Sequence, residues 1–202
     1  MGMKTKLHDS LGYTLIELMT VVAVLAIVLT VGVPQLNIYF QGNRMVSNTN
    51  DLVSALQIAR SEAIKQGTRA TVCKSSNPTA TPPACSTTAG WEDGWIAFID
   101  NDGIVGSYSS ANDGDLLRVY EGVSGNLVTV TPQDASIADF VSFTSRGVPK
   151  TAVGATQSGV FSICDDRGLK NAAGNVVARG VSLNAAGRVR STRLESKIVS
   201  CP

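Results

Sequence analysis

Residues 12–17, GYTLIE, and the apolar run from residue 18 to residue 33, LMTVVAVLAIVLTVGV, decide the fold. No charged residue occurs between Leu18 and Asn43. With residues 13–16 added, the run approaches the roughly 20 residues that a helix needs to cross a bilayer. The short segment before it is basic, with Lys4 and Lys6, and a positive flank favours retention in the cytoplasm. The sequence therefore predicts one N-terminal membrane-spanning helix, interrupted by a single charge, Glu17.

The expected cleavage site lies before the apolar run. An ordinary secretory signal is cut after its apolar region at small residues, and residues 33–36, VPQL, offer a poor site of that kind. GYTLIE instead resembles the prepilin peptidase site of type IV pilins and pseudopilins. The resemblance implies a cut between Gly12 and Tyr13, N-methylation of Tyr13 and retention of the apolar helix. Tyr13 stands where the family usually has Phe.

Glu17 and Pro34 are the two unusual residues of this helix. Glu17 becomes the fifth residue after the cut, and a carboxylate within an apolar segment is costly unless it has a function or a partner. We expect it to pair with the positive amino terminus of a neighbouring subunit and to set the axial register of a filament; the alternative is a carboxylate that snorkels to the membrane edge. Pro34 removes a helix hydrogen bond and is expected to bend the helix.

A second helical pattern follows Pro34 and ends near Gly67, a residue typical of helix C-termini. Its apolar face is Met45, Thr49, Leu52, Leu56, Ala59 and Ala63. The other faces hold Arg44, Asn48, Asp51, Arg60 and Lys65. One helix from about 14 to 66 is predicted, about 80 Å long at 1.5 Å per residue. Its second half is expected to pack on a sheet. Residues 59–63, ARSEA, resemble the end of this helix in the FimT/FimU/GspH branch of the pilin family.

The remainder of the chain reads as short strands separated by turns. Strands are predicted at 69–74, 116–120, 127–131, 140–143, 159–164, 180–183 and 189–193. Residues 90–100, GWEDGWIAFID, resemble the central strand region of GspH/FimT-type minor pilins, and Trp95 and Phe98 are expected in the core. The fold class is thus α+β, type IV pilin-like, with a long N-terminal helix packed on antiparallel sheet(s). The expected division is leader 1–12, apolar helix 13–34, amphipathic helix 35–67 and β-rich domain 68–202.

Four cysteines behind an export signal indicate two disulfides in an oxidising compartment. Sequence proximity favours Cys73–Cys85 and Cys164–Cys201 among three pairings, with four free buried thiols as the alternative. On the chain-entropy model these bridges stabilise by about 3 and about 4 kcal/mol. No zinc site is expected, because the sequence has no C-x-x-C pair and its one histidine, His8, lies in the leader.

We predict no enzymatic activity and no cofactor, because no catalytic arrangement of Ser, His, Cys or paired carboxylates can be drawn without arbitrary choice. Two acidic, glycine-containing loops, 100–103 and 112–115, have the oxygen ligands that calcium prefers. Neither has the downstream glutamate of an EF-hand loop. D-G and N-D-G also form ordinary hairpin turns, which is the interpretation we favour over calcium.

Charge is distributed unevenly although the net charge is only +1. Residues 91–139 hold nine acids and one base, and residues 140–202 hold nine bases and three acids. Six of those nine bases are arginine, whose planar fork suits phosphate oxygens. The C-terminal third therefore has the charge and the side chains of a phosphate-binding surface.

Residues 187–190, GRVR, are the sharpest local feature of this basic region. On a strand, Arg188 and Arg190 point to one face, and Gly187 permits a turn with positive φ. The motif resembles the G-R-x-R of FimT-type minor pilins, which bind DNA in natural transformation. The resemblance implies backbone-directed, salt-sensitive DNA contact. The supporting residues would be Arg193, Arg179, Arg167, Arg146, Lys150 and Lys197. The alternative is solvated arginines, or arginines paired with the acidic half of a neighbouring subunit.

Two functions are therefore expected as competitors. The first is a minor pilin that binds extracellular DNA for uptake; the second is a FimU-like priming minor pilin or a GspH-like pseudopilin of type II secretion that binds no DNA. Both imply other pilins and prepilin peptidase as partners. Both also imply a single pass through the inner membrane with a periplasmic C-terminal domain, before assembly into a pilus or pseudopilus.

Overall fold

The computed structural model describes residues 12–122, 127–193 and 201, and the expected leader segment 1–11 lies outside them. The chain divides into two compact units, residues 1–40 and 41–202. Among the described residues, one helix, α1 (Leu15–Gln66), continues through Pro34, and eight strands follow it. The predicted α+β class with a long N-terminal helix and antiparallel sheets is confirmed. By length and composition, α1 is the helix among the described residues that is apolar enough to cross a membrane.

The two ends of α1 follow from local sequence. At its start the Glu17 N–H donates to Thr14 Oγ1 at 3.3 Å and the Thr14 N–H donates to Glu17 Oε2 at 3.5 Å. This reciprocal capping box satisfies two amide groups that the first helical turn leaves free. At its other end Gly67 has φ +68°, a conformation that glycine adopts without steric cost. The predicted bounds of about 14 and 66 agree with these ends.

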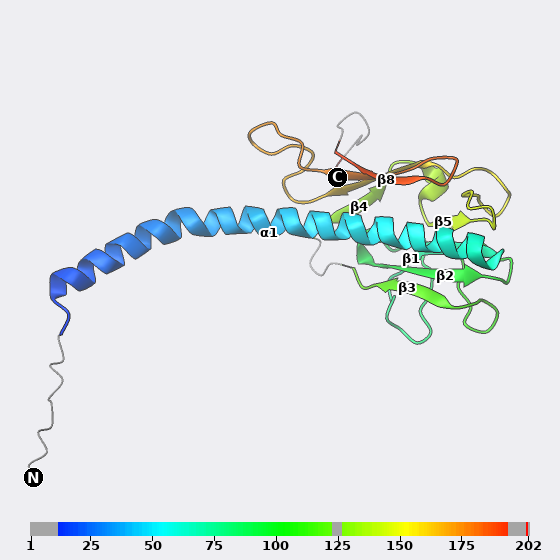
Figure 1. Cartoon of the computed structure of the whole chain (residues 1–202), viewed down its shortest axis with the longest axis horizontal. Coiled ribbons are helices and arrows are strands. Elements are labelled where there is room, and N and C mark those ends of the chain that lie inside the picture. The colour runs from blue at the N-terminus through cyan, green and yellow to red at the C-terminus, as the bar shows by residue number, and fades with distance from the viewer. Residues whose placement is uncertain (1–11, 123–126, 194–200, 202) are drawn as a thin grey trace, which may run out of the picture. The chain divides into compact units, whose positions relative to one another are not determined.

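The part of α1 within the second unit lies between two sheets (Figure 1). The predicted apolar face, Met45 to Ala63, is buried, and its side chains share one core cluster with strands of both sheets. The buried stripe also includes Ala55, beside Leu52 and Leu56, and the packing of the helix on antiparallel sheets agrees with the predicted fold class.

Both sheets have four strands and antiparallel pairing throughout. The first has the order β3-β2-β1-β5, formed by β1 (Arg69–Lys74), β2 (Trp95–Asp100), β3 (Leu116–Tyr120) and β5 (Phe140–Phe143). The second has the order β4-β6-β7-β8, formed by β4 (Thr129–Pro132), β6 (Gly159–Cys164), β7 (Arg179–Leu183) and β8 (Val189–Thr192). Two 3-10 turns, η1 (Trp91–Asp93) and η2 (Ala135–Ile137), precede β2 and β5. The predicted strands match these within one or two residues at each end.

Trp95 and Phe98 are buried, as predicted, but in different clusters. Trp95 stacks on Tyr120 with 3.8 Å between ring centroids, and the Tyr120 hydroxyl donates to Asn48 Oδ1. Burial, with a smaller contribution from Asp51, raises the pKa of Tyr120 to about 12. The prediction that Asn48 lies on an outer face of the helix is wrong: it is 3% exposed, because Tyr120 supplies a partner for its amide.

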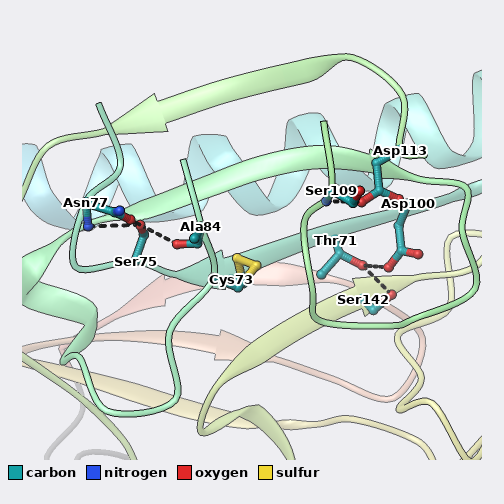
Figure 2. The surroundings of a disulfide bond; sticks show 10 residues. Thr71, Cys73, Ser75, Asn77, Ala84, Asp100, Ser109, Asp113 and Ser142 are labelled. Atoms are coloured by element: carbon teal, nitrogen blue, oxygen red, sulfur yellow. Dashed lines mark hydrogen bonds between the residues drawn. A yellow bond between two sulfur atoms is a disulfide. The ribbon is translucent and has the colours of Figure 1, made fainter. Parts of the chain in front are cut away.

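The structure contains the two disulfides that sequence proximity favours, and no cysteine is free. Cys73–Cys85 closes the loop after β1, and Cys164–Cys201 ties the end of β6 to the C-terminus. Beside the first bridge, Ser75 Oγ donates to the Ala84 carbonyl at 2.6 Å (Figure 2). The bridge and this hydrogen bond together hold the two ends of residues 75–84, a segment rich in Pro, Ser and Thr.

Candidate nucleic-acid interface

The turn between β7 and β8 places the GRVR motif. Asn184 organises this turn, because its Oδ1 accepts hydrogen bonds from the Arg188 amide at 2.8 Å and the Ala186 amide at 3.1 Å. Gly187, the first residue of the motif, has φ +77°, the positive φ that its place in the turn predicts. Asn184 was not among the predicted site residues, although Asn followed by A-A-G is a typical turn signal.

Strand alternation then separates the motif into two faces. Val189 is 8% exposed and belongs to the core, whereas Arg188 and Arg190 are exposed on the opposite face. Arg190 pairs across the ladder with Ser182, which in turn pairs with Val160. Because directly paired residues share a face, Val160, Ser182 and Arg190 form one outward row across three strands.

A groove of about 660 Å³ follows this outward face. It is lined by Ser158, Gly159, Val160, Ser182, Leu183, Asn184, Ala185, Arg188 and Arg190. No acidic residue is among these described lining residues. The ion pairs found in the described part of the chain involve Lys65, Lys74, Arg118 and Arg167, so Arg188 and Arg190 are not neutralised by an acid there. No acid in the described part of the chain blocks either guanidinium group from binding an external anion.

A second basic turn, residues 144–148, lies beside the first. It follows β5, has Gly147 at φ +70°, and presents Arg146 to solvent. A Cβ atom placed on Gly187 would lie 2.1 Å from the Gly147 carbonyl oxygen, so the two turns are in direct contact. Arg146 and Lys150 also line a shallow hollow of about 340 Å³. Thus the structure brings Arg146 and Lys150 to the end of the molecule that carries Arg188.

Three other predicted supporting residues lie elsewhere. Arg167, Arg179 and Arg193 line a small pocket of about 190 Å³ with Gly42 and Met45 of α1. Arg167, Arg179 and Arg193 therefore lie apart from the groove that Arg188 and Arg190 line. Lys197 lies outside the described residues.

Charge also distinguishes these three arginines. Arg167 Nε donates to Asp165 Oδ2 at 3.0 Å, and this hydrogen bond raises the pKa of Arg167. Burial lowers the pKa of Arg179, and the positive charge of Arg193 lowers it further. Arg167 is thus already paired, whereas Arg179 and Arg193 repel each other.

Strand register explains the separation. Arg179 pairs with Ile163 and has the same parity as Val181, so it points to the helix-facing side. Arg193 has the same parity as Val189. The alternation of side chains along a strand indicates which face each of these arginines occupies, whereas their charge alone does not.

The two acidic loops considered for calcium converge. One carboxylate oxygen from each of Asp100, Asp102 and Asp113 lies within 4.8 Å of the others. The carboxylate of Asp113 accepts amide hydrogen bonds from Asn101 at 3.1 Å and from Asp102 at 3.3 Å. It also accepts one from the Ser109 amide at 2.7 Å (Figure 2). These contacts give the Asp113 carboxylate a role in joining the two loops.

Asp100 differs from the other two acids because it is 3% exposed. Thr71 Oγ1 donates to its Oδ2 at 2.6 Å, which leaves Oδ1 buried without a hydrogen bond (Figure 2). Burial raises the pKa of Asp100, and the nearby Asp113 and Asp102 add to the rise.

The long helix with an apolar first part, followed by antiparallel sheets, defines the class of type IV pilin-like proteins. The family described as Type II transport protein GspH matches residues 48–187, and the Prokaryotic N-terminal methylation motif matches residues 7–33. The chain therefore belongs to the GspH family and carries the pilin methylation motif. The family match ends at Gly187, so it does not include Arg188 and Arg190.

Solved structures agree on the fold. Two crystal structures of the Pseudomonas aeruginosa PAO1 type IV minor pilin FimU, in space groups P21 and P65, are each 22% identical to the chain. They cover 79% and 77% of this chain and 96% and 98% of their own, with TM-scores of 0.53 and 0.51. No curated protein matches the chain.

Family and fold together give the general role. The chain is a member of the GspH family of type II transport proteins and has the fold of a type IV pilin-like protein. The methylation motif implies processing by prepilin peptidase, membrane anchoring and assembly with other pilins.

Proposed function

We propose that this protein is a minor pilin of a type IV pilus that binds extracellular DNA through Arg188 and Arg190 for uptake in natural transformation. The observation that carries this proposal is the outward pair of exposed arginines over a groove, with no acid among its described lining residues. The two side chains are two residues apart on an extended segment, about 6.7 Å along the chain. That spacing is comparable to that of successive phosphates on one nucleic-acid strand.

The chemistry favours phosphate over base recognition. Guanidinium groups form paired hydrogen bonds to phosphate oxygens, which position a nucleic acid without reading its sequence. The described residues that line the groove include no aromatic ring, so base stacking is not provided there. Arg146 and Lys150, on the adjoining turn, would extend the contact along the backbone.

The N-terminal residues would deliver this surface to the filament. In our proposal the peptide bond between Gly12 and Tyr13 is cut, Tyr13 is methylated, and Pro34 allows the helix to bend within the filament. Glu17 would pair with the amino terminus of a neighbouring subunit and set the axial register, in addition to its capping bonds with Thr14. Before assembly the chain would cross the inner membrane once, with residues 68–202 in the periplasm.

A direct test compares DNA binding by the full chain in nonionic detergent with that of Arg188→Ala/Arg190→Ala. We expect the double variant to bind at least about tenfold more weakly, a loss of about 1.4 kcal/mol. Arg44→Ala/Lys65→Ala is the matched control, because it removes the same charge from exposed positions on α1. The control should bind within about twofold of the wild type, because neither Arg44 nor Lys65 lines the groove. Equal affinities of the wild type and Arg188→Ala/Arg190→Ala would contradict the proposal.

The second candidate is a priming subunit that binds other pilins and no DNA. It is favoured by the family match to a type II transport protein and by the fold shared with FimU. A gene deletion that abolishes pili or secretion, together with purified protein that does not bind DNA, would decide for it. Secretion genes next to the coding sequence would point to the pseudopilin.

A further inference from the structure

One side chain of α1 contacts both basic turns. Arg60 Nε donates to the Gly147 carbonyl at 3.0 Å, and Arg60 Nη2 donates to the Ala186 carbonyl at 3.0 Å. The first carbonyl belongs to the turn after β5, in one sheet, and the second to the turn between β7 and β8, in the other. A single guanidinium group therefore joins the two sheets at this end of the molecule.

The packing around Arg60 allows little adjustment. Its Nε lies 3.1 Å from the place that a Cβ would occupy on Gly147, and also 3.1 Å from the corresponding place on Gly187. Both glycines have positive φ and are buried. The backbones of the two turns can approach the guanidinium and each other because neither position has a side chain.

Each joined turn carries an exposed arginine next to its glycine. Arg146 precedes Gly147, and Arg188 follows Gly187. We propose that Arg60 is a positioning residue that holds these two turns together, so that Arg146 and Arg188 act on one anionic ligand as one surface. This inference rests on the proposed DNA binding for its functional consequence, but the positioning itself does not.

Arginine suits this role better than lysine. Its planar fork presents N–H groups at fixed angles, so that two carbonyls on different chain segments are bound at once. A lysine ammonium keeps the charge but is a single point on a flexible stem. Arg60→Lys therefore separates positioning from charge, and Arg60→Met removes both bonds while it keeps an apolar stem.

The first measurement needs no DNA. Amide hydrogen exchange at Gly147 and Gly187 reports the two turns, because these amides donate to Thr144 O at 2.7 Å and Asn184 O at 2.9 Å. In the full chain in nonionic detergent, we expect Arg60→Met to speed exchange at both amides at least about tenfold, and Arg60→Lys to do so for at least one. Arg44→Lys is the control, because its side chain on the same helix is exposed and forms no ion pair with a described residue. Unchanged exchange at both glycines in both Arg60 variants would overturn the inference.

The second measurement is a double-mutant cycle on DNA affinity with Arg60→Lys and Arg146→Ala. If Arg60 positions Arg146, then Arg146→Ala should lower the affinity several-fold in the wild type and less than about twofold in the Arg60→Lys protein. Equal losses in both backgrounds would show that Arg60 does not act through this turn. If Arg188→Ala/Arg190→Ala leaves DNA affinity unchanged, the proposed function fails, and the exchange data still decide whether Arg60 positions the turns.

Discussion

At the scale of single residues, Gly187 is constrained both by its backbone conformation and by a close backbone neighbour. Its φ of +77° is costly for other residues, and a Cβ would lie 2.1 Å from the backbone oxygen of Gly147. Gly154 has φ +82° but no atom within 4 Å of the corresponding Cβ position. The two glycines share the conformational constraint and differ in steric contact.

Gly187→Ala is therefore predicted to destabilise the protein by about 3 kcal/mol or more, and Gly154→Ala by only about 1 kcal/mol. The urea midpoints of the two variants, measured against the wild type, give the comparison. Equal losses of stability in the two variants would contradict the close approach of Gly187 to the Gly147 carbonyl oxygen.

A second residue-scale prediction concerns Asp100, whose pKa is raised above its ordinary value of 3.8 mainly by burial. At pH values between 3.8 and the raised pKa, Asp100 is protonated in the folded chain and ionised in the unfolded chain. The contribution of Asp100 to the free energy of unfolding therefore falls as pH rises through this window and stays low above it. Asp100→Asn removes the ionisable group, so the stability of the wild type relative to this variant should fall from pH 3.5 to pH 7.

Urea titrations at several pH values measure this difference. Asp115→Asn, which changes an exposed carboxylate in the same region, is the control. A difference between wild type and Asp100→Asn that does not change with pH would contradict the proton linkage that burial of Asp100 implies.

At the scale of elements, α1 stabilises the second unit through the buried stripe that contacts both sheets. Leu52 is fully buried in the shared core, whereas Gln57, on the same helix, is exposed. Leu52→Ala should cost about 2–5 kcal/mol, because it removes apolar contacts and leaves a cavity. Gln57→Ala should change stability by less than about 0.5 kcal/mol. Thermal unfolding of both variants tests this, and a small loss for Leu52→Ala would show that the helix is not a central layer.

The elements were also the most predictable part of the fold. The helix bounds follow from Thr14, Glu17 and Gly67, and the strands follow from short alternating segments between turn residues. These signals are local, so one sequence carries them. The burial of Asn48 was not predictable, because its partner Tyr120 lies 72 residues away on β3.

At the scale of the whole molecule, the sequence predicted the composition of the candidate site better than its arrangement. Arg188 and Arg190 lie on one face as the GRVR alternation indicates, and Gly187 has the positive φ that its place in the turn requires. A separate pocket is lined by Arg167, Arg179 and Arg193. Its separation from the face of Arg188 and Arg190 depends on the register of β7 against β6. In our proposal, Arg60 holds the two basic turns together. Hydrogen bonds between segments so far apart in the chain cannot be predicted from a single sequence.

The salt dependence of DNA binding tests the central claim most directly. Each phosphate contact contributes about 0.9 to the slope of log affinity against log salt concentration on duplex DNA. If Arg188 and Arg190 each bind one phosphate, Arg188→Ala/Arg190→Ala should reduce the magnitude of that slope by about 1.8, whereas Arg44→Ala/Lys65→Ala should leave it unchanged. The same slope for the wild type and Arg188→Ala/Arg190→Ala would contradict the account, because the arginines over the groove would then contact no phosphate.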